Sequence, residues 1–168
     1  MGKMIFDCRD PQQLDSALAL HPFFQPALQY WQSLTGQGLP TRRDIDPVDI
    51  PDLLANVMLL DVLNDGADFR YRLAGTAVEH NFGASIKGLV LSEIVQIFPT
   101  IQPILDVKRR CVATRSPYAC DAAVFTHFGT QKQVYCCAMP LSDDGRHPTQ
   151  IFAIGILERA TEPVRDNS

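Results

Sequence analysis

Residues 42–83, RRDIDPVDIPDLLANVMLLDVLNDGADFRYRLAGTAVEHNFG, decide the fold of this chain. Within this stretch the mostly apolar segment Asn56–Leu63 predicts a buried strand, and residues 64–66, Asn-Asp-Gly, are a hairpin turn signal. Apolar and basic residues alternate over Asp68–Leu73, which predicts a second strand. The segment Gly75–Gly83 then predicts a short helix that ends at a glycine. The stretch contains no recognisable catalytic constellation.

The chain before this stretch is expected to be helical. Asp10 followed by proline begins a first helix well, because aspartate can cap it and proline is tolerated in its first turn. His21 precedes another proline and should interrupt the pattern. Phe24, Leu28 and Trp31 then recur at helical spacing and form an apolar stripe. A proline- and aspartate-rich connector follows this second helix.

The second half of the chain predicts further helices and then strands. Ser92 is expected to cap one helix, and a longer helix follows the break near Pro99. Lys108 and the two arginines after it are expected on the solvated face of that helix. The final elements are three predicted strands at Tyr118–His127, Gln131–Leu141 and Thr149–Glu158.

This order of elements predicts an α+β fold, with a five-stranded antiparallel sheet, short helices on one face and an N-terminal flanking helix. Three regions are expected: a helical flanking segment at 1–38, the main domain at 39–158, and a disordered polar tail at 159–168. A chain of 168 residues is long enough for one domain with a hydrophobic core.

The predicted sheet is apolar on both faces. In the strand at 131–141, Val134 and Cys136 face one way, whereas Tyr135, Cys137 and Met139 face the other. Both faces must therefore be covered. The central helices can cover one face, and either the N-terminal helix or a second subunit can cover the other.

Composition narrows the function classes. The charged fraction is 20% and the net charge is −4, without a basic stripe, so we expect no nucleic-acid partner. No apolar run is long enough to span a bilayer, and the N-terminus lacks a signal-peptide pattern. We therefore expect a cytoplasmic protein that does not associate with a membrane. The five cysteines form no CxxC pair, and no metal-binding motif is present.

The sequence resembles the PAS domain over residues 25–158. The resemblance rests on the segment Arg72–Gly83, in which a helix ends in an apolar residue and glycine, and on the second glycine at Gly88. The motifs Arg43–Pro47, with the sequence RDIDP, and Phe69–Thr76, with the sequence FRYRLAGT, are similar to those of short stand-alone bacterial PAS proteins.

The resemblance implies a curved sheet with a small cavity between sheet and helices, and dimerisation through flanking helices. PAS domains bind haem, flavin, small metabolites or no ligand. The segment 92–116 has no histidine to serve as the axial ligand of haem, and residues 80–83, His-Asn-Phe-Gly, have no cysteine for flavin photochemistry. The cofactor therefore stays unknown, and the resemblance argues against haem and photoactive flavin.

The same resemblance implies a set of cavity residues from both layers. His80 is a candidate because imidazole can donate or accept a hydrogen bond, although an exposed helical histidine is the simpler interpretation. Arg70 and Arg72 are expected to pair with Asp61, or with Asp44 and Asp46 of the connector, rather than with a carboxylate ligand. The candidate ligand-binding residues are Tyr71, Leu73, Thr76, His80, Phe82, Tyr135, Cys137 and Met139, and the candidate interface residues are Phe24, Leu28 and Trp31.

These expectations define three hypotheses. The first is a non-catalytic sensory or interaction module, which binds a small, partly apolar ligand and signals through a homodimer or a protein partner. The second is a scaffold whose core is filled by side chains and which has no ligand. The third, less favoured, is a small α+β enzyme, which would need a polar, open pocket with a perturbed histidine or acid.

Overall fold

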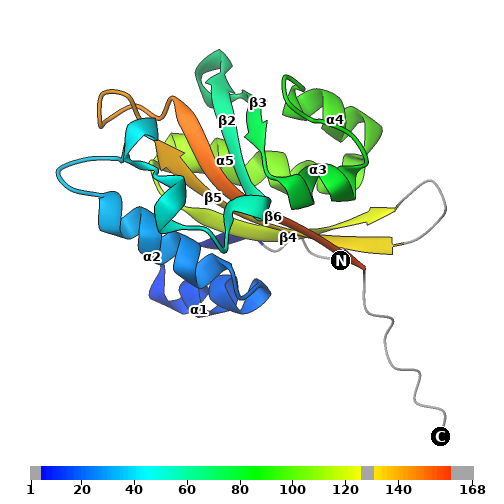
Figure 1. The fold of residues 1–168 in the computed structure, drawn as a ribbon, viewed down its shortest axis with the longest axis horizontal. Coiled ribbons are helices and arrows are strands. Elements are labelled where there is room, and N and C mark those ends of the chain that lie inside the picture. Colours follow the sequence, from blue (N-terminus) through cyan, green and yellow to red (C-terminus); the bar gives the residue numbers. More distant parts are fainter. Residues whose placement is uncertain (1–4, 126–130, 160–168) are drawn as a thin grey trace, which may run out of the picture.

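The computed structural model describes residues 5–125 and 131–159. In this part of the chain six strands form one antiparallel sheet in the order β1-β4-β5-β6-β2-β3 (Figure 1). Sequence patterns predicted five of them; the additional strand, β1, is only three residues long. The strands are β1 Ile5–Asp7, β2 Val57–Leu63, β3 Asp68–Ala74, β4 Tyr118–Phe125, β5 Gln131–Leu141 and β6 Gln150–Arg159.

Helices cover both faces of this sheet, which confirms the α+β prediction. In Figure 1 the N-terminal helices lie on one side of the sheet and the remaining helices on the other. The helices are α1 Pro11–Leu20, α2 Phe24–Leu34, α3 Thr76–Phe82, α4 Leu91–Ile97 and α5 Gln102–Thr114. Short 3-10 turns lie at Arg42–Asp44, Pro47–Asp49, Leu54–Asn56, Asn64–Gly66 and Pro99–Ile101.

Helix α2 packs on the sheet of its own chain. Phe24 is fully buried, and Leu28 and Trp31 are 2% and 7% exposed, in a cluster with strands β5 and β6. The Trp31 Nε1–H group donates a hydrogen bond of 2.9 Å to the carbonyl of Pro140 on β5. These three candidate interface residues therefore cannot form a dimer interface in this arrangement, because the sheet already covers them.

The connector between α2 and β2 is held in place by hydrogen bonds of its own aspartates. The Asp46 carboxylate accepts a hydrogen bond of 3.0 Å from the Val48 N–H group and caps the turn that follows. The Asp44 carboxylate accepts one of 2.8 Å from the Thr41 N–H group. The Tyr30 hydroxyl of α2 accepts a bond of 2.9 Å from the Asp46 N–H group, which fixes the connector against the helix.

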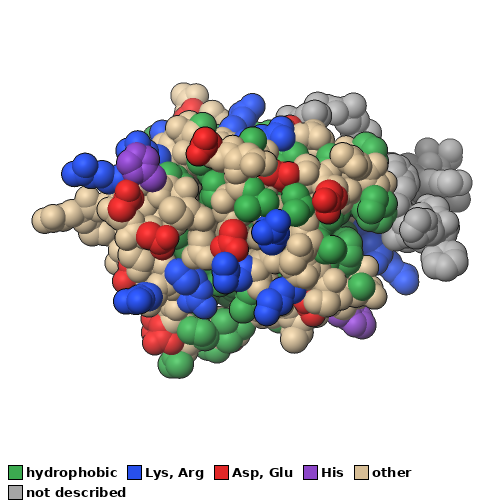
Figure 2. Space-filling view, turned by 90° about the horizontal axis from the view of Figure 1, so that it is seen from above, with side chains coloured by type: hydrophobic (Ala, Val, Ile, Leu, Met, Phe, Trp, Pro, Cys, Tyr) green, Lys and Arg blue, Asp and Glu red, His purple; other side chains and the backbone are tan. Residues whose placement is uncertain are grey.

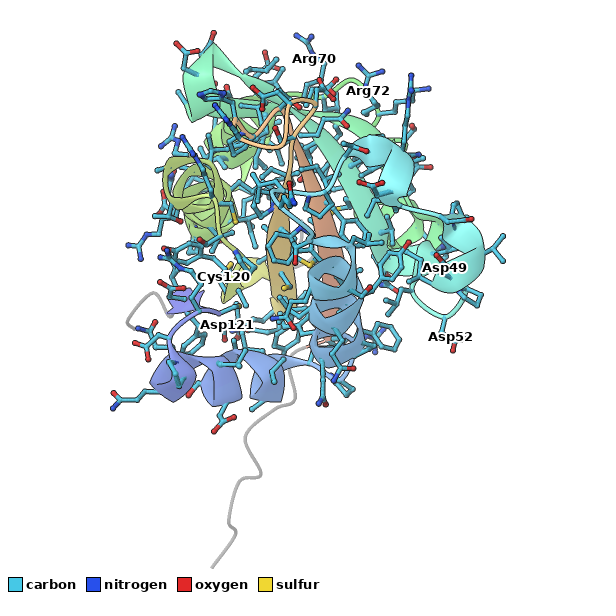
Figure 3. All side chains as sticks on the ribbon, turned by 90° about the vertical axis from the view of Figure 1, so that its left-hand side faces the viewer. Asp49, Asp52, Arg70, Arg72, Cys120 and Asp121 are labelled. Atoms are coloured by element: carbon cyan, nitrogen blue, oxygen red, sulfur yellow. The ribbon has the colours of Figure 1, made fainter. Side chains whose placement is uncertain are left out.

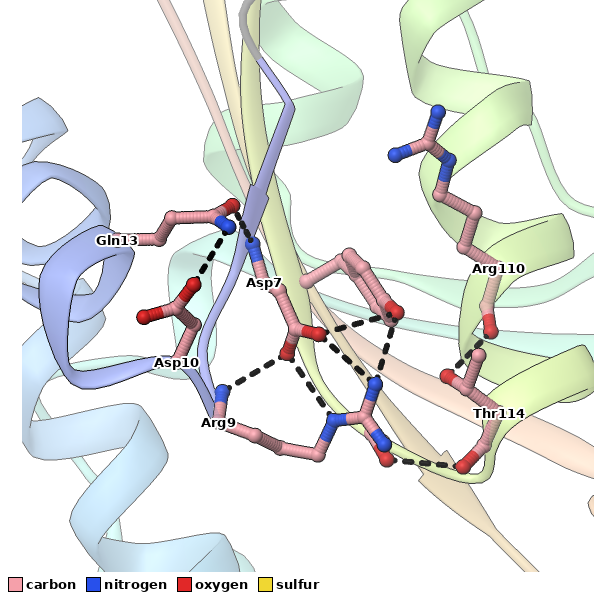
Figure 4. A network of polar contacts seen from close by, with 8 residues as sticks. Asp7, Arg9, Asp10, Gln13, Arg110 and Thr114 are labelled. Carbon is pink, nitrogen blue, oxygen red and sulfur yellow. Dashed lines mark hydrogen bonds and ion pairs between the residues drawn. The ribbon is translucent and has the colours of Figure 1, made fainter.

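Strand β1 is held at the edge of β4 by a polar network (Figure 4). Arg9 donates to the Asp7 carboxylate through Nη2 at 2.8 Å and Nε at 3.1 Å, and also to the Tyr118 hydroxyl on β4 at 3.2 Å. The hydrogen bond from Arg9 outweighs partial burial and lowers the pKa of Asp7. So short a strand has no periodic signal, and this explains why sequence patterns missed it.

A β-bulge changes the expected alternation of β3. Leu59 pairs with Leu73 and Leu60 with Tyr71, so Arg72 has no partner in the ladder. Beyond the bulge the side chains exchange faces: Tyr71 is buried, whereas Leu73 is 41% exposed. Strict alternation would put Leu73 on the same face as Phe69 and Tyr71, but it lies on the opposite face.

Two predicted segments extend beyond the described residues. The end of the first C-terminal strand, at 126–127, falls in the undescribed segment 126–130. Of the predicted polar tail at 159–168, only Arg159 is described, and it is the last residue of β6. The remainder of the tail lies outside the described residues.

Candidate functional site

A cavity of about 620 Å³ lies between the sheet and the layer formed by α3, α4 and α5. Its floor comes from strands β2 to β6, and its roof from α3, α4 and the start of α5. The lining is mostly apolar, with few polar side chains. The lining residues are Met58, Tyr71, Val78, Asn81, Phe82, Ile86, Ile94, Phe98, Ile101, Ile104, Val124, Lys132, Val134, Cys136, Gly155, Ile156, Leu157 and Arg159.

The strand register explains the floor. Three adjacent rungs run across β4, β5 and β6, and side chains two residues apart on each strand face the cavity together. Gly155 leaves room for the side chain of Met58 in this floor, because a Cβ atom at position 155 would lie 2.4 Å from the Cε atom of Met58. The rungs are Cys120–Cys136–Gly155, Ala122–Val134–Leu157 and Val124–Lys132–Arg159.

Helix α3 forms a thinly attached part of the roof. None of its residues is buried, yet Val78, Asn81 and Phe82 line the cavity. Its start is fixed by close approach at Gly75, where a Cβ atom would lie 2.3 Å from the carbonyl oxygen of Ala55. An element with little buried surface opens at low free-energy cost. Helix α3 is therefore the part of the roof best suited to move.

Helix α4 is capped by a residue from another element. Ser92 was predicted to be its N-cap, but that position is Val90, which makes no side-chain capping bond. Instead the Asp68 carboxylate of β3 accepts hydrogen bonds from the N–H group of Ser92, at 3.1 Å, and from its hydroxyl. The prediction was wrong because a cap supplied from a distant strand leaves no local signal.

The structure brings together only part of the predicted ligand site. Tyr71 and Phe82 line the cavity, as expected from β3 and α3. Thr76 and His80 lie on the exposed side of α3, which favours the simpler interpretation of His80 as a surface residue. Leu73 is outside the lining because of the bulge at Arg72.

The other three predicted cavity residues lie on the wrong face for this role. Tyr135, Cys137 and Met139 belong to the cluster beneath α1 and α2. Their neighbours Val134 and Cys136 face the cavity instead. Both faces of β5 are apolar, so alternation defined the two sets without showing which set faces the central helices.

Lys108 is the polar residue that sequence patterns misplaced most clearly. It was expected on the solvated face of α5, but it is fully buried. Its Nζ atom lies 3.4 Å from the carbonyl oxygen of Ile104 and 3.5 Å from the Sγ atom of Cys136. Its spacing of four residues from Ile104 placed it within the apolar stripe, a signal that the two adjoining arginines obscured.

The surroundings of Lys108 hold several groups with perturbed ionisation. Burial opposes its charge, whereas Cys136, Tyr71 and Cys120 favour that charge when ionised, and the net effect raises the pKa of Lys108. Burial likewise raises the pKa of Tyr71 and of Cys120. Burial also raises the pKa of Cys111. The phenol of Tyr71 and the thiols of Cys120 and Cys111 are therefore uncharged near neutral pH.

The basic residues of β3 are not part of the cavity. Figure 3 shows Arg70 and Arg72 projecting outward from this strand. Arg72 Nη2 lies 2.8 Å from the Asp61 carboxylate on β2, which confirms the predicted pair. Burial raises the pKa of Asp61, but hydrogen bonds from Arg72 and Gln150 outweigh it, and the pKa is lowered.

The surface of the described residues shows mixed charge. On the face in Figure 2, basic and acidic side chains are interspersed with apolar ones. Among the described residues, no cluster of three or more histidine, cysteine, aspartate or glutamate side chains is arranged to hold a metal ion. In the same part of the chain, every helix is too short or too polar to cross a bilayer.

This chain is similar to a solved structure and to a family profile. Among solved structures, an RNA-binding light-oxygen-voltage receptor is 18% identical, with a TM-score of 0.46; the match covers 73% of this chain and 36% of that one. No curated protein matches the chain. The sequence profile of the PAS domain matches residues 20–158. The chain therefore belongs to the PAS domain family, whose members serve as sensory and interaction modules.

Proposed function

We propose that this protein is a non-catalytic sensor that binds a small, mostly apolar ligand between its sheet and helices α3 to α5. The cavity of about 620 Å³ carries this proposal. Its volume falls within the ~300–1,000 Å³ typical of small-molecule sites, and such sites are usually apolar with a few placed polar groups. Tyr71 supplies one such group, because its hydroxyl has no hydrogen-bond partner within the described part of the chain.

This cavity argues against both the scaffold hypothesis and the enzyme hypothesis. A scaffold with a filled core would leave no space of this size on the helical face. An enzyme would be expected to place a histidine or carboxylate in the site. The described lining contains neither; its nitrogen-bearing side chains are Asn81, Lys132 and Arg159.

The proposed signal begins at α3. A ligand in the cavity would contact Val78 and Phe82, and the helix would then gain buried surface that it lacks without ligand. Helix α3 would then have an open position and a position closed over the ligand. Binding shifts the equilibrium toward the closed position only by the difference in ligand affinity between the two. The change would then pass to a second copy of the chain or to a partner protein.

The test is to block the cavity without removing a polar group. In Val134→Phe the added ring would enter the cavity from the centre of the β5 floor. Val48→Phe is the matched control, because Val48 is 82% exposed and is not a lining residue. Titration with the neutral fluorescent probe N-phenyl-1-naphthylamine should give a saturable fluorescence signal for the wild type and the control. The affinity of Val134→Phe for the probe should be lower by at least about tenfold.

Equal binding by Val134→Phe and the wild type would refute a ligand site in this cavity. Native mass spectrometry of protein from its own host, compared with the denatured sample, would give the mass of any retained ligand. Hydrogen exchange should show slower exchange in α3 when the probe is bound.

Output through a homodimer or a protein partner is part of the proposal. Phe24, Leu28 and Trp31 are buried within the chain, so contacts must use other surfaces. Among the described residues, Val48 and Ile97 are large apolar side chains that are mostly exposed, at 82% and 68%. Light scattering at rising protein concentration, with and without probe, measures whether a dimer forms. The five unpaired, buried cysteines suit a reducing compartment such as the cytoplasm.

A further inference from the structure

Two basic side chains lie side by side at one end of the cavity. Lys132 on β5 and Arg159 on β6 are direct partners in the strand register, and both line the cavity. Lys132 is half-buried and Arg159 is exposed, so this end of the cavity, called the mouth from here on, reaches the surface. The next rungs inward carry Val134 and Leu157, then Cys136. The sheet floor is therefore basic at the mouth and uncharged behind it.

Among the described residues, neither of these two cations makes an ion pair with an acidic side chain. The acidic side chains of the same strands face the other way and already have partners. Glu158 lies 3.1 Å from Nε2 of His21, and the Asp121 carboxylate accepts a hydrogen bond of 3.0 Å from Gln133. Like charges directly opposite each other on neighbouring strands destabilise a sheet. An anion between Lys132 and Arg159 would remove that repulsion.

Building on the proposed function, we propose that the ligand is a carboxylic acid with an apolar body, whose carboxylate is bound between Lys132 and Arg159. The guanidinium fork of Arg159 suits a carboxylate, and Lys132 adds a second charge from the opposite strand. The apolar body would lie inward, against Val134 and Ile104. This orientation keeps the charged group near water, where its desolvation cost is smallest.

The rival position for the carboxylate is the inner end, near Lys108. That residue is not part of the cavity lining, because its Nζ atom sits behind Ile104 and Cys136, at 3.4 and 3.5 Å from the carbonyl oxygen and the Sγ atom. A carboxylate there would have to leave water completely. The mouth is therefore the better site for the charge.

The experiment displaces N-phenyl-1-naphthylamine with three probes of equal chain length: dodecanoate, dodecanol and dodecylamine. It compares the wild type with the double variant Lys132→Gln/Arg159→Gln. The matched control, Arg43→Gln/Arg110→Gln, removes two exposed charges elsewhere. A third variant, Lys108→Met, tests the inner position.

For the wild type and the control, dodecanoate should bind about tenfold or more tightly than dodecanol, and dodecylamine more weakly than either. The Gln double variant should lose this preference, to a ratio of about one, while it still binds dodecanol as the wild type does. High salt should weaken the preference, because the mouth is partly exposed. Lys108→Met should keep it.

The outcomes separate this inference from the proposed function. If dodecanol displaces the reporter but dodecanoate has no advantage, or if the Gln double variant keeps that advantage, the mouth assignment is overturned while the apolar site stands. Loss of the preference in Lys108→Met also overturns it. If the reporter and all three probes fail to bind, both the proposed function and this inference are wrong.

Discussion

Replacing the buried Lys108 with methionine is expected to stabilise the protein. Lys108 is fully buried in α5, and within the described residues no carboxylate forms an ion pair with it. Burial opposes the charge of its ammonium group, and the nearby Tyr71 and Cys120 are uncharged at neutral pH. Methionine has a similar length and flexibility and can fill the same space without a charge.

The size of the effect follows from the weak hydrogen bonds of the ammonium. Replacing a buried ion with an apolar residue of similar volume is neutral or stabilising by ~1–4 kcal/mol. The bond of 3.4 Å to the Ile104 carbonyl lies near the outer limit of hydrogen-bond geometry, and the contact of 3.5 Å with Cys136 uses sulfur, a weak acceptor. Each therefore contributes less than ~1 kcal/mol. The expected gain in the free energy of unfolding is therefore about 1–3 kcal/mol, or roughly 2–12 °C in Tm for a chain of this length.

Urea unfolding followed by circular dichroism, with calorimetry for the Tm, measures this gain. Lys87→Met is the matched control, because Lys87 lies exposed in a turn, and its change should stay within about 0.5 kcal/mol. A Lys108→Met variant that is less stable than the wild type by about 1 kcal/mol or more would refute the reasoning. It would mean that the ammonium has a compensating partner, such as a thiolate or a bound anion.

Three further substitutions test packing, capping and charge. Trp31→Phe should cost ~1–3 kcal/mol in urea unfolding, because the carbonyl of Pro140 loses its buried donor, and it should leave the oligomeric state unchanged; a change in oligomeric state alone would contradict the packing described. Asp68→Ala should cost ~1–2 kcal/mol and speed hydrogen exchange at the start of α4; unchanged exchange there would show that the cap is dispensable. Asp61→Asn should lower the Tm at neutral pH, since Arg72 lowers the pKa of Asp61 in the folded state. That stabilisation is present above the ordinary aspartate pKa and is lost as pH falls through the folded one, so the two Tm curves should converge in acid; a constant gap would exclude the charge as its cause.

Strands and helices were largely predictable because each depends on local patterns. The strand at Gln131–Leu141 was predicted with the bounds that the structure shows, and the turn at residues 64–66 joins β2 and β3 as expected. The break between α1 and α2 at His21 was also correct, since proline restricts the residue before it. The sequence resemblance to the PAS domain added the arrangement of these elements.

The candidate site was less predictable, because it depends on relations between distant elements. A bulge at Arg72 reverses the alternation of β3 through its pairing with β2, which no pattern within β3 records. Cys136 and Cys137 are both apolar, so only the packed helices decide which one faces the cavity. Lys132 could have been assigned from the sequence to the same face as Val134 and Cys136, because the three residues alternate along the strand.

The separation of the two apolar layers by the sheet has a consequence for how this protein can vary. Met58 and Ile104 belong to the layer that holds the cavity, whereas Trp31 and Met139 belong to the layer beneath α2. Substitutions at distant sites with no shared neighbours add nearly independently. Substitutions that reshape the cavity should therefore combine nearly additively with substitutions in the opposite layer. The chain thus has two sets of positions that can change separately, one around the cavity and the other beneath α2.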